Sequence, residues 1–364
     1  MKTVGEICHA LDNWANPSWA EDYDNVGLLV GRPETAVTQV LVSLDVTESI
    51  VEEAAQQECQ LIIAHHPLIF KGLKKLTGRH WVERTVMLAL EKGIAIYAIH
   101  TNLDNAVWGV NAQLGKVLGL QQLEILRPFQ GRLQKVITYV PEDYVELVRT
   151  AMFSAGGGQI GKYDECSVSV DAMGTFRPKE GADPFSGELG KRSEQAEKRL
   201  EVLVRDTDIA AVVKAMKAAH PYEEVAYECI PLSNEDQDRG AGMIGSLPQA
   251  MGENEFITHC KKQLQLPVLR HTALNGRKIE RVAFCGGSGS FLLGDALAKR
   301  ADAYLTGDLK YHEFFEADGR LLLADIGHFE GEQYTQQLLV EKLRSFATFA
   351  VRLAQTPTNP IFYA

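Results

Sequence analysis

Histidine and carboxylate side chains follow several apolar segments of the chain, close to the point where each segment ends. His65 and His66 follow LIIA, Asp104 follows IYAIHTNL, and His328 and Glu332 come after LLLAD. His328 and Glu332 are four residues apart, a spacing that puts two side chains on one helix face. Three imidazoles and two carboxylates suit Zn²⁺, Mn²⁺ or Fe²⁺, because Mg²⁺ and Ca²⁺ prefer oxygen ligands. The five residues therefore predict a transition-metal site.

Each of these motifs also has an ordinary structural explanation. His65 and His66 could hydrogen-bond or cap a loop, and Asp104 could form an Asx turn or cap the next helix. His328 and Glu332 could be an exposed pair at the start of a helix, where a glutamate suits the helix dipole. Four segments that are remote in sequence nevertheless follow apolar strands, namely these three and the segment that contains His312. Because the carboxyl ends of parallel strands form the ligand crevice of an α/β sheet, a shared site is favoured.

The elements that must position these residues alternate between strand and helix at both ends of the chain. This alternation predicts one mostly parallel sheet with helices on its faces, and we expect the site at one edge of this single sheet. The expected strands include 40–46, 61–67 and 93–104, and the expected helices include 3–15, 81–92, 109–119 and 253–265.

The middle of the chain has a different rhythm. Within 127–240 the order is β-α-β, a polar loop over 177–197, and β-α-β, which is typical of the ferredoxin-like split βαβ pattern. The segment NEDQDRGAGMIG (234–245) resembles a linker. We therefore expect the α/β class, with a discontinuous α/β metal-binding domain formed by 1–126 and 241–364 and a ferredoxin-like α+β domain inserted at 127–240.

Composition excludes several classes of protein. The net charge of −11 argues against a nucleic-acid groove, which needs clustered lysine and arginine. The six cysteines form no CxxC pair, so neither a zinc ribbon nor a disulfide scaffold is indicated, and free thiols suit a reducing compartment. No signal-peptide pattern and no apolar run of membrane-spanning length is present. The sequence predicts a cytoplasmic protein that binds neither a membrane nor nucleic acid.

Other residues near the segment ends could contact a substrate. Gly286, Gly287 and Ser288 lie in CGGSGS, which could bind phosphate through backbone N–H groups or simply form a tight turn between strand and helix. Asn25 and Lys310 could contact an anion in the same crevice.

Two further histidines are candidates for proton transfer. His312 follows the strand that precedes TGDLKYHE, and His100 lies in HTNLDNA. Either could instead be an ordinary loop histidine or could support a metal ligand.

Five ligands can hold two divalent ions if one carboxylate bridges them. Two such ions carry four positive charges, and two carboxylates with one bridging hydroxide remove three. The site would keep about one positive charge, which suits a small anionic substrate such as a phosphate ester.

The motifs together resemble the Nif-three-like dinuclear metal-centre family, whose members are often named type-two GTP cyclohydrolase I homologues. The matching segments are DNVGLLVG (24–31), AHHPLIF (64–70), HTNLDNA (100–106), HPYEEVAYE (220–228), CGGSGS (285–290), TGDLKYHE (306–313) and DIGHFEGEQ (325–333). The resemblance implies two divalent ions per subunit, zinc foremost with manganese or iron as alternatives, held by His65, His66, Asp104, His328 and Glu332. It also implies a toroidal homohexamer, with an insert similar to trimeric proteins of the PII and CutA type.

Two functions are compatible with these expectations. The first is a dinuclear metal-dependent hydrolase similar to a GTP cyclohydrolase, in which a metal-bound hydroxide attacks a nucleotide or phosphate-bearing substrate. The family label does not fix the substrate, because one fold hosts many activities. The alternative is a non-catalytic metal-binding regulator or adaptor assembled as a ring. An open coordination position favours catalysis, and a closed shell favours a structural role.

Overall fold

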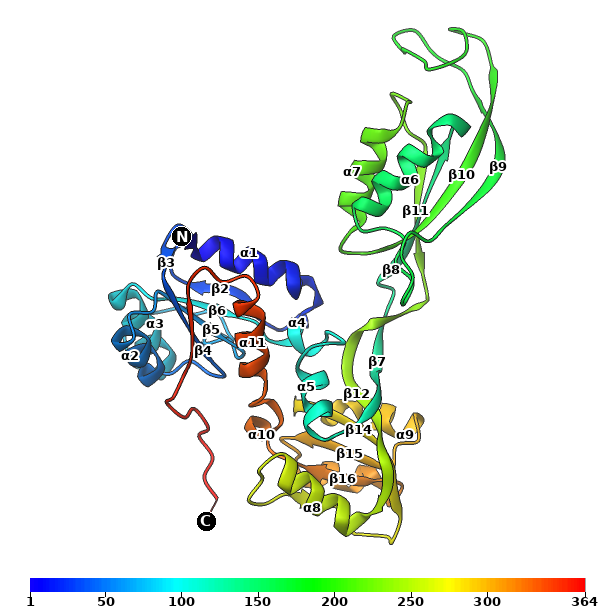
Figure 1. Ribbon diagram of the computed structural model, residues 1–364. Coiled ribbons are helices and arrows are strands. Elements are labelled where there is room, and N and C mark those ends of the chain that lie inside the picture. The colour runs from blue at the N-terminus through cyan, green and yellow to red at the C-terminus, as the bar shows by residue number, and fades with distance from the viewer. Residues whose placement is uncertain (364) are drawn as a thin grey trace. The chain divides into compact units, whose positions relative to one another are not determined.

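The computed structural model describes residues 1–363, which form two compact units (Figure 1). The first unit is built from Met1–Arg127 together with the chain from Asp238 onward, and the second is Pro128–Gln237. Both units mix helices with β-sheets. The α/β class expected from the sequence is therefore confirmed.

A five-stranded sheet in the first unit has the order β17-β4-β5-β6-β2, in which β2 runs antiparallel to β6 and the other neighbours are parallel. Val42 and Ile63 pack on the face covered by α1 and α11, whereas Leu41 and Ile62 pack on the face covered by α2 and α3. Because both faces are covered, the central strands are continuous apolar runs. The bounds are β17 (Ala350–Leu353), β4 (Gln39–Ser43), β5 (Leu61–Ala64), β6 (Ala95–Ala98), β2 (Gly27–Val30), α1 (Val4–Trp14), α2 (Glu48–Gln56), α3 (Trp81–Lys92) and α11 (Thr335–Arg344).

A six-stranded sheet in the same unit has the order β13-β16-β15-β14-β12-β7. Phe284 and Leu305 face a core shared with α5 and α8, and Ala283 and Tyr304 face a core shared with α9 and the 3₁₀ helix η4. The bounds are β13 (Arg270–His271), β16 (Leu322–Asp325), β15 (Ala303–Gly307), β14 (Lys278–Ser288), β12 (Glu235–Gly252), β7 (Gln121–Gln130), α5 (Val110–Val117), α8 (Glu253–Gln263), α9 (Leu293–Ala298) and η4 (Tyr311–Ala317).

The expectation of one sheet in the α/β part was wrong. Strands β5 and β6 belong to the five-stranded sheet, whereas β15 and β16 belong to the six-stranded sheet. The sequence shows that each strand is apolar and ends in polar residues, but it does not show which strands pair. The candidate site is consequently formed by the strand ends of two sheets rather than by one edge.

The expected linker at 234–245 is also wrong, because residues 235–245 lie in the 18-residue strand β12. Met243 and Ile244 are buried and pair with Phe284 and Ala283 of β14. The glycines of this segment serve close packing: a Cβ on Gly242 would lie 2.7 Å from a Leu292 methyl carbon, and one on Gly245 would lie 2.7 Å from a Leu123 methyl carbon.

The second unit contains one four-stranded sheet of order β11-β8-β10-β9, with every neighbouring pair antiparallel. Val136 and Val202 of the sheet pack with Val148 of α6 and Met216 of α7. Beyond the two helices, β9 and β10 continue into a long connecting loop (Figure 1). The bounds are β8 (Leu133–Val140), η2 (Glu142–Tyr144), α6 (Val145–Ser154), β9 (Ser167–Phe176), β10 (Ser193–Arg205), α7 (Ile209–Ala219) and β11 (Tyr227–Leu232).

Short elements complete the first unit. They are β1 (Lys2–Thr3), which pairs with β3 (Ala36–Val37), the 3₁₀ helices η1 (Pro17–Trp19) and η3 (Ser290–Leu292), and the short helices α4 (Thr101–Asp104) and α10 (His328–Glu332). Across residues 1–363, none of the helices has the length and apolar character needed to cross a membrane.

Candidate metal centre

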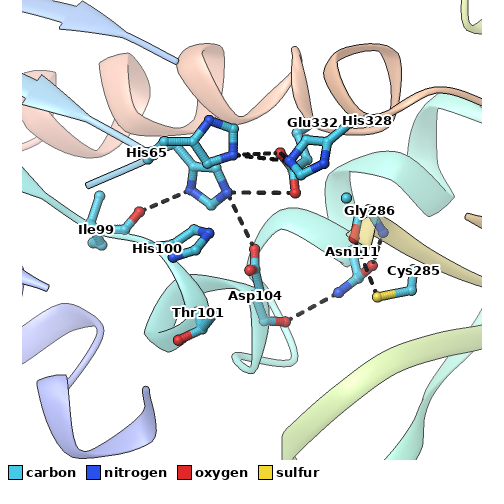
Figure 2. Close-up of polar contacts among 12 residues, drawn as sticks. His65, Ile99, His100, Thr101, Asp104, Asn111, Cys285, Gly286, His328 and Glu332 are labelled. Atoms are coloured by element: carbon cyan, nitrogen blue, oxygen red, sulfur yellow. Dashed lines mark hydrogen bonds and ion pairs between the residues drawn. The ribbon is translucent and has the colours of Figure 1, made fainter. Parts of the chain in front are cut away.

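The five predicted ligands converge from three places in the first unit. His65 and His66 follow strand β5, Asp104 is the last residue of helix α4 after β6, and His328 and Glu332 are the first and last residues of helix α10 after β16. Figure 2 shows the side chains of His65, Asp104, His328 and Glu332 pointing toward one another. Helix α10 thus presents its (i, i+4) pair toward the end of β5, as its spacing predicts.

His65 is fixed by a backbone carbonyl and leaves one ring nitrogen free. Its Nδ1–H donates to the Ile99 carbonyl at 2.9 Å, so Nε2 carries a lone pair. This Nε2 lies 3.5 Å from Asp104 Oδ1 and 3.9 Å from Glu332 Oε1. Nε2 of His65 and Oδ1 of Asp104 are both buried, and neither has a hydrogen-bond partner among the described residues. Leaving such an atom without a partner costs about 1–3 kcal/mol, so the pair is suited to coordinate a cation.

His66 and His328 are oriented in the same way: each ring turns Nδ1 toward an aspartate and Nε2 toward the other histidine. His66 Nδ1 contacts Asp45 Oδ1 at 2.7 Å, and His328 Nδ1 contacts Asp308 Oδ2 at 2.6 Å. Their Nε2 atoms lie 3.3 Å apart and are 2.9 and 3.1 Å from Glu332 Oε2. A carboxylate on the far nitrogen of a histidine is the usual support for a metal ligand, because it fixes the tautomer and the ring orientation.

Glu332 takes part in two different clusters. Its two carboxylate oxygens face different histidines. Oε1 lies toward His65, and Oε2 lies toward His66 and His328. Three groups of ligand atoms have mutual separations of no more than 4.8 Å, namely His65–Asp104–Glu332, His66–His328–Glu332 and His65–His66–His100. The first two groups share only Glu332, which is the arrangement that one bridging carboxylate would give.

The protonation equilibria reflect this crowding. Burial lowers the pKa of His65 to about 4. Burial also acts to lower the pKa of His66 and His328, but hydrogen bonds to their carboxylate partners outweigh it and raise the two values to about 10 and about 11. Burial, with the charge of Glu332, raises the pKa of Asp104. Burial opposes ionisation of Glu332 as well, yet contact with three imidazoles holds its pKa well below the usual value. The metal-free cluster therefore stores protons that a cation would displace.

The glycine segment after the core of β14 allows Glu332 to approach. Gly287 has φ +63°, and a Cβ there would collide with Glu332 Oε1. The N–H of Gly286 donates to Asn111 Oδ1 at 2.9 Å, and the N–H of Gly289 donates to Thr306 Oγ1 at 2.8 Å. Because these donors already have partners, the geometry favours close packing around Glu332 over phosphate binding by this segment.

The other candidate residues are distributed unevenly. A cavity of about 560 Å³ beside the cluster is lined by His100, Gly286 and Ser288, but not by Asn25, Lys310 or His312. The Asn25 amide donates to the Ile69 carbonyl, and the Lys310 backbone N–H donates to Glu313 at the start of η4. His312 is exposed beside Tyr311 and Phe315.

His100 is held next to the cluster by a residue to which the sequence gave no definite role. Its Nδ1 contacts Asp24 Oδ1 at 2.9 Å, and its ring packs edge-on against His65 and His66. Asp24 Oδ2 also accepts from the backbone N–H of Thr101 at 3.0 Å. Burial opposes ionisation of Asp24, but these hydrogen bonds lower its pKa to about 2. Asp24 therefore stays charged and orients His100.

Sequence reasoning assigned no role to the carboxylates behind the metal ligands. Asp45 follows β4 and Asp308 follows β15, so the strand-end rule that selected His65 applies equally to both. Asp45 also precedes a helix, and this local context resembles an ordinary turn before a helix cap. The available signal was the position at a strand end, not the residue type.

Comparison with known proteins agrees with the resemblance found in the sequence. The family model described as Duf34/NIF3 (NGG1p interacting factor 3) matches residues 2–360. A Bacillus subtilis protein named GTP cyclohydrolase 1 type 2 homolog is 36% identical over 365 residues, covering 98% of each chain. A Mycobacterium tuberculosis protein of the same name is 34% identical over 366 residues, covering 98% of this chain and 96% of its own.

Solved structures give the same result. A Bacillus cereus protein related to NIF3 superposes with a TM-score of 0.87 at 36% identity, covering 100% of this chain and 99% of its own. A Staphylococcus aureus protein superposes with a TM-score of 0.80 at 29% identity and the same coverage. Because the family model matches nearly the whole length of this chain, the chain belongs to the Duf34/NIF3 (NGG1p interacting factor 3) family.

Proposed function

We propose that this protein is a dinuclear metal-dependent hydrolase whose two ions share Glu332. One ion would be held by His65, Asp104 and Glu332, and the other by His66, His328 and Glu332. The observation that carries the proposal is the pair of buried atoms without partners, His65 Nε2 and Asp104 Oδ1, which lie 3.5 Å apart. Nitrogen-rich ligands favour zinc, with manganese or iron as alternatives.

The environment of the ligands supports catalysis over a closed structural site. The side chains of His66, His328 and Asp104 keep 21%, 33% and 22% of their surface exposed, and all three line the cavity of about 560 Å³. Catalytic metal sites keep an open position, whereas structural sites are closed. This exposure is the reason for preferring a hydrolase to the regulator or adaptor that the sequence also allowed.

Two bound ions would supply an acidified water and electrophilic activation of a carbonyl or phosphoryl oxygen. The chain's own residues would do the rest. Asp45 and Asp308 orient the two imidazoles, and His100, held by Asp24, is placed to accept or deliver a proton at the edge of the cavity. Asn111 connects Asp104 to the glycine segment through its amide, donating to the Asp104 carbonyl and accepting from Gly286.

The charges around the site refine the substrate class. Among the described residues, those that line the cavity include no lysine or arginine. Five carboxylates line the cavity, those of Glu21, Asp45, Asp104, Asp308 and Glu332, and their formal charge would outweigh the four positive charges of two divalent ions. An anionic group would therefore bind by direct coordination rather than through a surplus of positive charge. The cavity favours a nucleotide-sized substrate whose reacting group is neutral or singly charged, such as a ring amide or a phosphodiester.

The proposal also covers the fold of the second unit and the oligomeric assembly of the protein. Sheet order β11-β8-β10-β9 with antiparallel neighbours is the arrangement of a ferredoxin-like fold, and we assign this fold, of the PII and CutA type, to the inserted unit. We further propose a toroidal homohexamer and a cytoplasmic location. Native mass spectrometry tests the assembly, and a dominant monomer would contradict it.

The experiment for the catalytic proposal is a hydrolysis screen with metal-free protein reloaded with Zn²⁺, Mn²⁺ or Fe²⁺. The substrates are GTP, phosphodiesters, phosphomonoesters and cyclic amides. The variant His66→Ala removes one ligand, and His9→Ala, an exposed histidine on α1, is the matched control. We expect turnover that His66→Ala lowers at least about 100-fold and His9→Ala leaves unchanged. Metal-loaded protein that turns over no member of the panel would favour the regulator instead.

A further inference from the structure

The second unit contains a cavity of its own, of about 410 Å³, a volume within the range of small-molecule sites. It lies between the far end of the β9–β10 hairpin, the loop that joins these strands, and the segment after α7. All of its lining residues belong to Pro128–Gln237. The cavity is therefore a feature of this unit alone and is independent of the candidate metal centre.

Aromatic rings form one wall of this cavity. Phe185 packs edge-on against Tyr144 with ring centroids 5.6 Å apart, and it lies 5.6 Å from the ring of Tyr222. Tyr222 in turn packs on His220. Phe185 is nevertheless 47% exposed, so one part of its ring is available to a ligand. An exposed aromatic surface in a concave site offers a π face that attracts cations.

The carboxylate of Glu197 on β10 also lines the cavity. Its Oε1 accepts a hydrogen bond of 2.7 Å from the Tyr222 hydroxyl. Gly174 on the neighbouring strand leaves room for the carboxylate, because a Cβ there would lie 2.5 Å from Glu197 Oε2. Within residues 1–363, Glu197 forms no salt bridge and Oε2 has no protein donor; its sequence neighbours Lys198 and Arg199 pair with other carboxylates.

The other charged residues that line the cavity also carry a net negative charge. Glu223 and Glu224 also line the cavity, against one exposed guanidinium, that of Arg177, so the lining carries a net charge of −2. Glu223 accepts from the Asp183 backbone N–H, which ties the long loop to the segment after α7. This balance disfavours a phosphate or carboxylate ligand.

We propose that this cavity binds a small organic ammonium ion, with the cationic nitrogen at Glu197 and its apolar body against Phe185 and Tyr222. A metal ion is a poorer occupant, because the described groups of His, Cys, Asp and Glu that are close enough to hold an ion all lie in the first unit. An organic cation uses both features at once, the carboxylate by ion pairing and the rings by cation–π contact. The inference does not depend on the hydrolase proposal.

The test is ligand-detected NMR titration of the full-length protein. Benzyltrimethylammonium and protonated benzylamine are the cationic probes, phenylacetate is the anionic probe, and benzyl alcohol is the neutral probe. We expect both cations to bind saturably and at least about tenfold more tightly than phenylacetate or benzyl alcohol.

Variants locate the site. Glu197→Gln keeps an acceptor for Tyr222 but removes the charge, and it should weaken binding of the cations about tenfold. Phe185→Leu keeps apolar bulk without the π face and should weaken it about threefold. Glu194→Gln, an exposed glutamate on the same strand outside the cavity, is the matched control and should change nothing.

Circular dichroism verifies that each variant is folded. Phenylacetate binding as tightly as the cations would overturn the proposal, as would cation binding that survives both Glu197→Gln and Phe185→Leu. The absence of saturable binding for both cations would overturn it equally.

Discussion

Asp45→Asn should weaken the binding of one of the two proposed ions and leave the binding of the other unchanged. Asp45 contacts His66 Nδ1 at 2.7 Å, whereas the ring of His65 is oriented by the Ile99 carbonyl. The substitution keeps an oxygen acceptor but removes the negative charge behind one imidazole. It should therefore affect the ion held by His66 and His328, not the ion held by His65 and Asp104.

The size of the effect follows from the exposure of the carboxylate. Replacing a residue that supports a metal ligand typically costs 10–100-fold in metal affinity, which is about 1.4–2.7 kcal/mol. The side chain of Asp45 is 34% exposed, so solvent screens part of its charge and the lower end, about tenfold, is expected. Asp308 is 47% exposed behind His328, and Asp308→Asn should cost less, about threefold.

Competition with a chromophoric zinc chelator measures both affinities, and elemental analysis gives the stoichiometry. Asp143→Asn, an exposed aspartate in the second unit, alters the net charge equally and serves as the control. We expect two zinc-binding steps in every protein. In Asp45→Asn the affinity of only one of the two steps should fall. Equal weakening of both steps, or no change in either, would refute the assignment of His66 and His65 to different ions.

Three further predictions concern pH, the glycine segment and the inserted unit. His66 and His328 have pKa values raised to about 10 and about 11 in the metal-free protein, so their stabilising contribution is complete below about pH 6.5 and is lost as pH rises through those values. Urea unfolding of the metal-free protein should show this decline in stability. Zinc affinity should rise with pH, up to about tenfold per pH unit for each proton displaced. A zinc affinity that does not change between about pH 6 and 9 would be contrary evidence. Gly287→Ala should lose metal because its Cβ collides with Glu332, while Gly276→Ala, with φ +73° and open space, should bear the same backbone strain and keep its metal; equal metal content in the two variants would dismiss the packing argument. Replacing 128–237 with a short linker should keep two ions per chain and reduce the oligomer measured by light scattering, and an unchanged assembly would show that the insert is not the assembly module.

The sequence was informative where a local pattern determines the local structure. Helix α3 spans Trp81–Lys92, the same residues that the periodicity predicts, because His80 caps its start and Gly93 ends it in the left-handed conformation. The strand-end rule brought His65, Asp104 and Glu332 together although the strands lie in two sheets. The polar ends of strands are a local property, whereas the pairing of strands is not.

The failures share a physical cause, which is that the partners of a residue are not written beside it. The glycines of β12 resembled a flexible linker, since the sequence does not show the Leu292 and Leu123 side chains that exclude a Cβ. The segment CGGSGS allowed either phosphate binding or a tight turn, because the sequence does not show that the N–H of Gly286 donates to Asn111 Oδ1. His312 follows a strand like the true cluster members, but the 3₁₀ helix η4 places it at the surface.

Anomalous diffraction at the metal edge from crystals of zinc-loaded protein tests the central claim most directly. The account predicts two peaks per chain, one within coordination distance of His65, Asp104 and Glu332, and the other within coordination distance of His66, His328 and Glu332. A single peak, or two peaks of which neither contacts Glu332, would contradict a dinuclear centre bridged by that carboxylate.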